Sequence, residues 1–258
     1  MPEATARLVA RVAGRFARDA LALGEGEVCA RFQRSVYLRL PGGKYACVGD
    51  ASLGCGPLNA LVDGFAAPPM DARLRVAVAA VWTAPVPPPH AAPDLAALQA
   101  AARGRVPAEG LGCLVVGSHN GVSGHAQPAL DALDRWLVGN ALADEAAMLV
   151  GLGPGLTPSG DDFLGGVMLA LHHVQRPTQA RGLWRWLEPR LARTSAISAA
   201  HLAAAAAGEG HEALHAALAH LFQRQPGWPA ALDRLDAIGH CSGWDALAGA
   251  AAVARNFG

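Results

Sequence analysis

One short pattern occurs twice in this chain and constrains the fold more than any other feature. Residues 159–166 and residues 242–249 both read S-G-x-D-x-L-x-G. Ser159 and Ser242 suit the N-cap position of a helix, and the Asp three residues later completes a capping box. The last glycine of each copy allows another helix to pack closely. The pattern therefore predicts two helices that begin in the same way and have a small residue on one face.

The first copy follows a loop rich in glycine and proline. Residues 151–166 read GLGPGLTPSGDDFLGG. A helix cap alone does not need the closely spaced glycines of this loop, whereas a backbone that wraps closely around a ligand does. The loop is not a phosphate-binding P-loop, because that motif requires a lysine, and Asp161 and Asp162 stand where the cation should be.

The two helix starts together predict a site for a small anion. Free N–H groups and the helix dipole both favour negative charge at a helix N-terminus. We therefore expect residues 151–162 and 239–245 to lie in one cleft, with the amide of Gly160 aimed at the ligand. The candidate anion-binding residues are Gly153, Gly155, Thr157, Ser159, Gly160, Ser242 and Gly243.

Three carboxylates accompany these residues and leave two alternatives open. Asp161, Asp162 and Asp245 are expected to orient the caps or to hold a metal. Adjacent carboxylates repel a bare phosphate, so they favour either simple capping or a bridging Mg²⁺. The residues alone do not assign a metal site, and each copy of the pattern taken by itself predicts only a helix cap.

Composition excludes several classes of protein. The 258 residues include 21 basic and 21 acidic side chains, and this neutral balance argues against nucleic acid as a partner. No apolar run reaches the length that spans a membrane. The five cysteines are scattered without a C-x-x-C pair, which is typical of reduced thiols in a cytoplasm. We expect a soluble, cytoplasmic protein.

The two halves of the chain differ in hydrophobic period, which predicts an α+β fold. We expect a β-rich domain over residues 1–124 and a helical domain over residues 125–258 that carries the glycine-rich loop. Residues 1–23 predict a leading amphipathic helix, and residues 94–103 a short helix capped by Asp94. The expected strands are 28–40, 44–48, 74–83 and 111–117, the first two forming a hairpin. The expected helices of the second domain are 128–150, 161–174, 184–191, 195–207, 211–222, 229–238 and 242–254.

Two further motifs are discounted. His211, Glu212 and His215 match H-E-x-x-H, but no suitable third zinc ligand follows. Residues 239–243 resemble a nucleophile elbow with Cys241 as the attacking group, but that elbow requires a preceding strand. A position at a helix N-terminus would lower the pKa of this thiol.

Three segments, in this order, resemble the AllH-type family. They are GLGPGLTPSGDDFLGG at 151–166, TSAIS at 194–198 followed by His201-Leu202 and an alanine run, and GHCSGWDALAG at 239–249. The resemblance extends over residues 110–258, and the N-terminal half is only loosely similar. This chain departs from the pattern at Cys241, where a hydroxyl residue is expected, and in its proline-rich N-terminal connector.

The resemblance implies a function. The family was long described as a domain of unknown function, and one branch is a subunit of oxamate carbamoyltransferase in allantoin breakdown, a part of purine degradation. It implies a subunit of an enzyme that moves a carbamoyl group between oxalurate and phosphate, giving oxamate and carbamoyl phosphate, together with partner subunits. These substrates are small anions, which suit paired helix N-termini with hydroxyl donors. The resemblance assigns no catalytic residue.

Two functions of other classes remain open at this point. One is a metal-dependent hydrolase in which Thr157, Asp161, Asp162 and Asp245 hold Mg²⁺ or Mn²⁺. The other is a non-catalytic ligand-sensing or scaffold subunit, in which the glycine loop packs against partner chains. Whether the chain is catalytic by itself is open as well.

Overall fold

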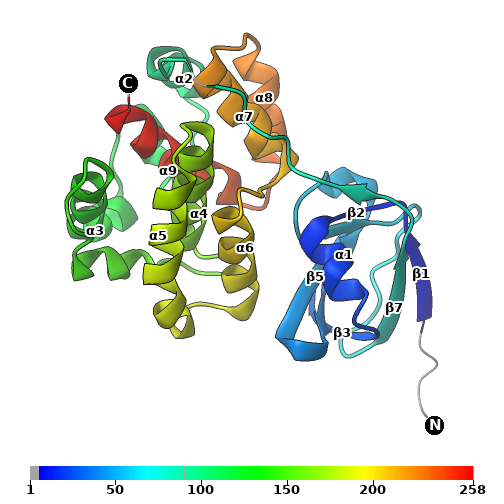
Figure 1. The fold of residues 1–258 in the computed structure, drawn as a ribbon. Helices are drawn as coiled ribbons and strands as arrows, with labels where there is room; N and C mark the ends of the chain where they lie inside the picture. Colours follow the sequence, from blue (N-terminus) through cyan, green and yellow to red (C-terminus); the bar gives the residue numbers. More distant parts are fainter. Residues whose placement is uncertain (1–5, 90, 258) are drawn as a thin grey trace. The chain divides into compact units, whose positions relative to one another are not determined.

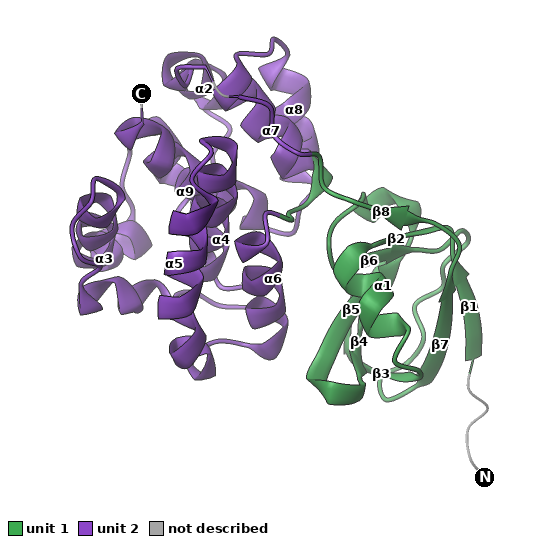
Figure 2. Ribbon diagram, viewed as in Figure 1, with its two compact units in different colours: residues 1–85, 209–212 green, residues 86–208, 213–258 purple. Residues whose placement is uncertain are grey.

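The fold is α+β, as the sequence predicts. A computed structural model describes residues 6–89 and 91–257, with strands in the first part of the chain and helices in the rest (Figure 1). The chain divides into two compact units, one of residues 1–85 with 209–212 and the other of residues 86–208 with 213–258 (Figure 2).

The first unit is built on one eight-stranded sheet. Its strand order is β1-β7-β3-β4-β5-β6-β2-β8, and the pairs β1–β7, β5–β6 and β2–β8 are parallel. The strands are β1 (Ala6–Ala10), β2 (Val12–Gly14), β3 (Gly26–Arg31), β4 (Ser35–Leu40), β5 (Lys44–Gly49), β6 (Asn59–Leu61), β7 (Arg73–Val78) and β8 (Val81–Trp82). Helix α1 (Arg15–Leu21) contributes Ala17, Ala20 and Leu21 to the core of this unit.

The predicted hairpin is present between β4 and β5. Leu40 pairs with Lys44 across the short 3-10 turn η1 (Pro41–Gly43), in which both glycines adopt positive φ. The expected strand 28–40 is divided, however, because Phe32 donates its amide to the Ser35 carbonyl and turns the chain. The predicted strand 74–83 is likewise broken into β7 and β8.

The predicted leading helix is wrong for most of its length. Residues 1–5 lie outside the described residues, and the chain then forms β1 and β2 before α1 begins at Arg15. Pairing in the sheet overrides the helical pattern, because β1 runs parallel to β7 with Ala6 opposite Leu74. Val9 is exposed while Ala10 is buried, as expected for a strand.

The second unit is helical, with α4 and α9 at its centre (Figure 1). Helices α5 and α6 pack against α4, while η3, α3 and α8 pack against α9. The elements are α2 (Leu95–Ala102), η3 (Gly112–Val116), α3 (Gly121–Leu137), η4 (Asp144–Leu149), α4 (Ser159–His173), α5 (Pro177–Leu187), η5 (Glu188–Arg193), α6 (Ala196–Ala206), α7 (Glu212–Gln223), α8 (Trp228–Asp236) and α9 (Ser242–Asn256). Asp94 caps α2, as predicted, by accepting from the Ala97 amide.

The expected strand 111–117 is instead the 3-10 helix η3. Leu111 and Leu114 are buried among the helices, and Gly117 ends the segment in the left-handed conformation. Because α2 and η3 belong to the helical core, the units divide near residue 85, whereas the sequence predicted a boundary at residue 124.

One predicted helix, 128–150, is displaced. Helix α3 begins at Gly121, where Asn120 and Ser123 form a capping box, and it ends at Leu137. Pro128 lies inside α3, and residues 144–149 form the separate segment η4. The expected helix 184–191 also begins earlier, at Pro177, which stands at the first helical position.

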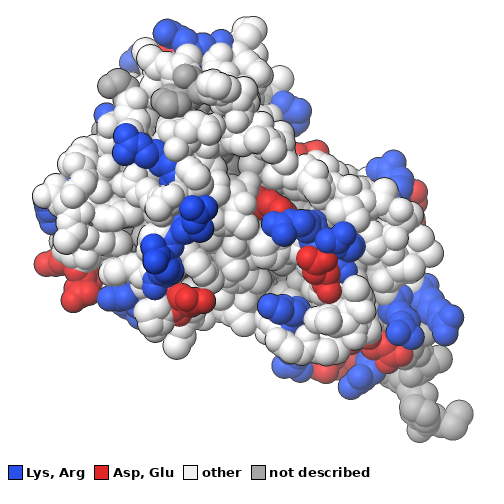
Figure 3. Space-filling model, in the orientation of Figure 1, with Lys and Arg blue, Asp and Glu red and all other residues white. Residues whose placement is uncertain are grey.

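The surface is mixed in charge. On the face in view in Figure 3, basic and acidic side chains are interspersed and form no continuous patch of one sign. None of the helices in the described part of the chain is long and apolar enough to cross a membrane. Each of the five cysteines is a free thiol.

Candidate functional site

The last glycine of each repeated pattern holds α4 and α9 together. A Cβ atom built on Gly166 of α4 would lie 1.8 Å from the carbonyl oxygen of Ala246 on α9. A Cβ on Gly249 of α9 would lie 2.0 Å from the carbonyl oxygen of Phe163 on α4. The two helices therefore approach each other through the same position of each copy, which confirms the predicted close packing.

This packing brings the two helix N-termini together. The hydroxyl oxygens of Thr157 and Ser242 lie 3.1 Å apart, and the Ser159 hydroxyl lies 3.9 Å from the Cys241 sulfur. The structure thus places residues 157–159 and 241–242 side by side, as expected for a shared site.

The predicted capping boxes, however, are wrong. Ser159 and Ser242 are the first residues inside their helices, and the N-cap residues Pro158 and Cys241 make no side-chain cap. Pro158 has the extended conformation that leads into a helix, with φ −59° and ψ 145°. The serine hydroxyls face the neighbouring helix start instead of their own first turn.

The second glycine pair, Gly160 and Gly243, serves packing. The Gly160 amide donates to the Leu152 carbonyl at 2.9 Å, so it is not aimed at a ligand as the sequence suggested. A Cβ on Gly160 would lie 2.0 Å from the Leu149 carbonyl oxygen, and one on Gly243 would lie 2.4 Å from that of Leu235. Each glycine lets the helix start lie directly against the backbone that precedes it.

The glycine loop before α4 keeps its own amides available. Gly153 and Gly155 are exposed and have φ values of 107° and 96°, a region that glycine adopts readily. Within the described residues, the amides of Gly153, Gly155, Thr157 and Ser159 donate to no protein acceptor. These four N–H groups are the free donors at the start of α4.

Asp161 holds two segments of the chain together through hydrogen bonds. Its side chain is 2% exposed and accepts from the Gly151 amide at 2.9 Å, from the Ser198 hydroxyl at 2.7 Å and from the Thr194 hydroxyl. It therefore ties the glycine loop to the segment before α6. Ser195 adds to this connection, because it caps α6 and donates to the Leu156 carbonyl.

Asp245 has a similar role on α9. The side chain is fully buried, and its Oδ1 accepts from the amides of Leu111 and Gly112 at 2.6 Å and 3.0 Å. Its Oδ2 is also buried, but no described residue donates a hydrogen bond to it. Burial raises the pKa of this carboxyl, and the nearby Ser159 hydroxyl and Leu111 amide act against the rise.

Asp162 differs from Asp161 and Asp245, because its carboxyl does not tie segments of the chain together. Its Oδ2 is buried and has no hydrogen-bond partner among residues 6–89 and 91–257. Burial raises the pKa of Asp162 well above its ordinary range, and the charges of Asp245 and Asp161 raise it further. The hydroxyls of Ser242 and Thr157 lie beside Asp162 and oppose that rise.

Cys241 is not an activated thiol. Burial, and after it the charge of Asp245, raises the pKa of Cys241 to about 11, although the residue stands at a helix start. The preceding element is the helix α8, so the strand that a nucleophile elbow requires is missing.

The H-E-x-x-H match does not form a metal site. The Nε2 atom of His211 lies 2.7 Å from the Leu53 carbonyl oxygen, and the ring of His215 is stacked on that of His173 at 5.8 Å. Across residues 6–89 and 91–257, no group of three or more His, Cys, Asp or Glu side chains is arranged to hold a metal.

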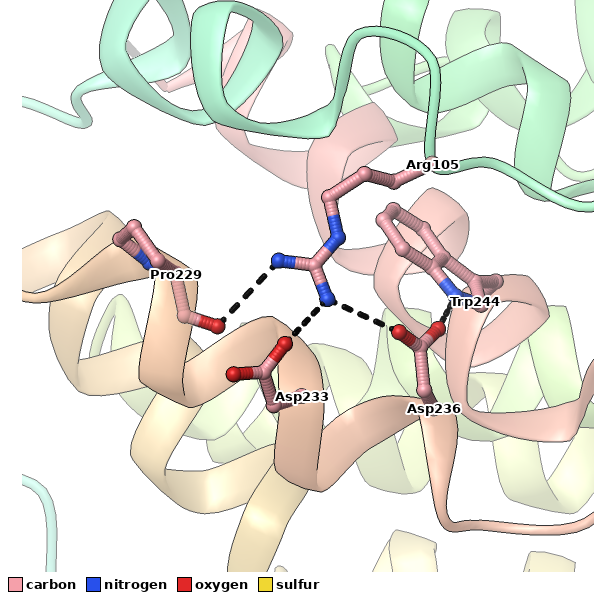
Figure 4. Close-up of polar contacts among 5 residues, drawn as sticks. All are labelled: Arg105, Pro229, Asp233, Asp236 and Trp244. Atoms are coloured by element: carbon pink, nitrogen blue, oxygen red, sulfur yellow. Dashed lines mark hydrogen bonds and ion pairs between the residues drawn. The ribbon is translucent and has the colours of Figure 1, made fainter.

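A distant arginine helps to position the start of α9. Arg105 donates to the carboxylates of Asp233 and Asp236 at 2.6 Å and 2.9 Å and to the Pro229 carbonyl at 3.3 Å (Figure 4). Asp236 also accepts from the indole N–H of Trp244, in the first turn of α9. No local motif signals this contact, which joins segments far apart in the sequence.

One comparison with known proteins gives a match. No curated protein and no solved structure matches the chain. Residues 149–254 match the family described as oxamate carbamoyltransferase subunit AllH, a span that contains the glycine loop, α4 and nearly all of α9. The AllH-type resemblance predicted from the sequence is thereby confirmed over these residues.

Proposed function

We propose that this chain is a subunit of an enzyme that transfers a carbamoyl group between oxalurate and phosphate, and that it binds one of these anions where α4 and α9 begin. The observation that carries the proposal is the family match, which covers both copies of the repeated pattern. In this proposal the chain works with partner subunits in the cytoplasm, in allantoin breakdown.

The donors at the two helix starts support the anion site. Gly153, Gly155, Thr157 and Ser159 offer amides that donate to no other described residue, and the N-terminal end of α4 favours negative charge. The hydroxyls of Thr157 and Ser242 are hydrogen-bonded to each other at 3.1 Å, so one of them donates to the other and the pair adds one more donor. Phosphate, carbamoyl phosphate and oxamate all offer oxygen atoms to such a set.

Carbamoyl transfer needs mainly orientation of the reactants and stabilisation of developing charge. A phosphate oxygen attacks the carbamoyl carbon, and negative charge develops on the carbamoyl oxygen in the tetrahedral transition state. Amides and hydroxyls fixed on a rigid helix pair are suited to both tasks, because they lose little freedom when the substrates bind.

The two rival functions find less support. Asp161 and Asp245 already accept hydrogen bonds from amides and hydroxyls, which leaves few oxygens for the Mg²⁺ site of a hydrolase. Packing explains Gly160 and Gly166, as a scaffold subunit requires, but it does not explain the exposed glycines at 153 and 155.

The test is an assay of the complete enzyme. The chain is co-purified with its partner subunits, and carbamoyl phosphate formed from oxalurate and phosphate is measured. We expect transfer activity that falls when Thr157→Val and Ser242→Ala are combined, and that is kept in the control Thr178→Val, an exposed hydroxyl on α5. A complete complex that transfers no carbamoyl group contradicts the proposed function. Unchanged kinetics in the double variant contradict the proposed site and favour a scaffold role.

A further inference from the structure

Two carboxyl oxygens lie buried where α4 and α9 begin, and neither receives a hydrogen bond from any described residue. They are Oδ2 of Asp162 on α4 and Oδ2 of Asp245 on α9. A buried carboxylate oxygen without a donor or counter-charge is costly, and a proton on one of two neighbouring carboxyls removes that cost.

Of the two carboxyls, Asp162 is the one free to carry the proton. Oδ1 of Asp245 accepts two backbone amides, and such donors stabilise the ionised form. Within the described residues no backbone amide donates to Asp162, and the hydroxyls of Thr157 and Ser242, which lie beside it, can accept as well as donate.

We infer that Asp162 is protonated in the resting protein and donates its proton to the leaving nitrogen during carbamoyl transfer. This inference rests on the proposed function for the reaction, but not for the proton itself. In the part of the chain that the structure describes, the other ionisable groups that act on Asp162 are Asp161 on its own helix, and Asp245 on α9 with Cys241 just before it. None of them brings a positive charge that would favour the ionised form.

The reaction requires such a donor. In the forward direction, a phosphate oxygen forms a bond to the carbamoyl carbon of oxalurate, and the bond from that carbon to the amide nitrogen breaks. The electron pair goes to the nitrogen, which takes the proton of Asp162 and leaves as the amide of oxamate. Asp162 then recovers a proton from the hydrogen phosphate group, which carbamoyl phosphate no longer needs. The step balances without any further reactant.

Removing the proton tests the inference without an activity assay. The infrared difference between the wild type and Asp162→Asn, measured on the whole chain near neutral pH, should contain the C=O band of a neutral carboxyl. The band should disappear as the pH is raised through the pKa of Asp162. A difference spectrum with only ionised-carboxylate bands contradicts the inference, whatever the enzyme's activity.

The complete complex tests the catalytic role. Asp162→Asn keeps the shape of the side chain but cannot transfer a proton, so kcat should fall about 10²- to 10⁴-fold with KM for phosphate little changed. In the wild type the forward rate should decline as pH rises through the pKa of Asp162. Because the balanced reaction neither consumes nor releases a proton, the reverse rate should decline over the same range. The residual forward and reverse activities of Asp162→Asn should not show this dependence on pH.

The outcomes separate this inference from the proposed function. An active complex whose Asp162→Asn variant keeps the wild-type kcat overturns the proton-donor role and leaves the carbamoyltransferase assignment standing. A fall in kcat in a variant that keeps the wild-type pH dependence also overturns the proton-donor role, because that result indicates a structural effect. A wild-type complex that transfers no carbamoyl group contradicts the proposed function, and therefore also the catalytic role of Asp162.

Discussion

The hydroxyl oxygen of Thr157 lies 3.1 Å from that of Ser242, although one residue precedes α4 and the other begins α9. The contact follows from a repeated pattern whose last glycine, in each copy, touches the backbone of the other helix. Two helices that start alike and cross at matched glycines necessarily bring their first turns together. The shared polar site is therefore a consequence of how the central helices pack.

The glycine at the helix crossing should be intolerant of a single methyl group. Gly166→Ala places a Cβ 1.8 Å from the Ala246 carbonyl, so α4 and α9 must separate. We expect a loss of about 3 kcal/mol or more in the free energy of unfolding. Gly165→Ala is the matched control, because its Cβ meets only Ala205 at 3.8 Å and alanine favours a helix. Equal stability of the two variants in chemical denaturation contradicts the proposed packing.

The adjacent carboxyls Asp161 and Asp162 should respond in opposite ways to replacement by Asn. Asp161→Asn turns an amide group toward donors from Gly151, Thr194 and Ser198, so it should lower the melting temperature. Asp162→Asn removes no protein hydrogen bond of comparable quality and should leave the melting temperature at pH 6 unchanged or raise it. A lower melting temperature for Asp162→Asn than for Asp161→Asn would show that Asp162, and not Asp161, holds the segments together.

The same carboxyl predicts a pH dependence of stability. The pKa of Asp162 is raised in the folded chain, so its contribution to stability is complete below the unfolded value and is lost as pH rises through the folded value. Wild type should therefore lose stability relative to Asp162→Asn as pH increases above about 4. A constant difference between the two melting curves from acid to neutral pH contradicts this prediction.

The buried side chain of His173 should make the stability of the protein depend on pH in the acid range. Burial, reinforced by His215 and His172, lowers the pKa of His173 to about 3. Its stabilising contribution is thus present above the unfolded value near 6.5 and is lost as pH falls toward 3. Replacing His173 by Leu should flatten the acid loss of stability by up to about 1.4 kcal/mol per pH unit. The exposed His125, changed to Leu, is the control. Parallel pH profiles of the wild type and the His173 variant contradict the assignment.

Two aspartates around Arg105 should differ in their effect on stability (Figure 4). Asp236→Ala leaves the indole N–H of the buried Trp244 without an acceptor and should cost about 1–3 kcal/mol. Asp233→Ala removes only an ion pair whose carboxylate is 71% exposed, so its effect should stay within about 0.5 kcal/mol. Thermal unfolding of both variants checks this order, and a larger loss for Asp233→Ala contradicts it.

The sequence predicts the central helices well, because their signals are local. Proline and glycine precede α4, and glycine precedes α9, while Ser195 caps α6 as its residue type suggests. The prediction from the sequence fails at residues 6–14 and at residues 112–116, where contacts with distant segments override the local pattern. The sequence predicts an amphipathic helix over the first of these segments, yet pairing with β7 makes residues 6–10 a strand, and pairing with β6 and β8 makes residues 12–14 another.

The site could be predicted as a meeting of two helix starts, but not in its details. Ser159 and Ser242 have the residue type of a cap, and only the structure reveals that each faces the other helix. The different roles of Asp161 and Asp162 depend on donors from residues 151, 194 and 198, which no local pattern specifies. Arg105 was missed for the same reason.

Binding of carbamoyl phosphate is the most direct test of the paired helix starts. Calorimetric titration of the complete complex with carbamoyl phosphate should show binding in the wild type and in Thr178→Val. Affinity should fall at least tenfold, a loss of about 1.4 kcal/mol or more, when Thr157→Val and Ser242→Ala are combined, since the hydrogen-bonded hydroxyl pair that donates to the anion is removed. Equal affinity of all three proteins, or no binding by the wild type at millimolar concentration, contradicts an anion site where α4 and α9 begin.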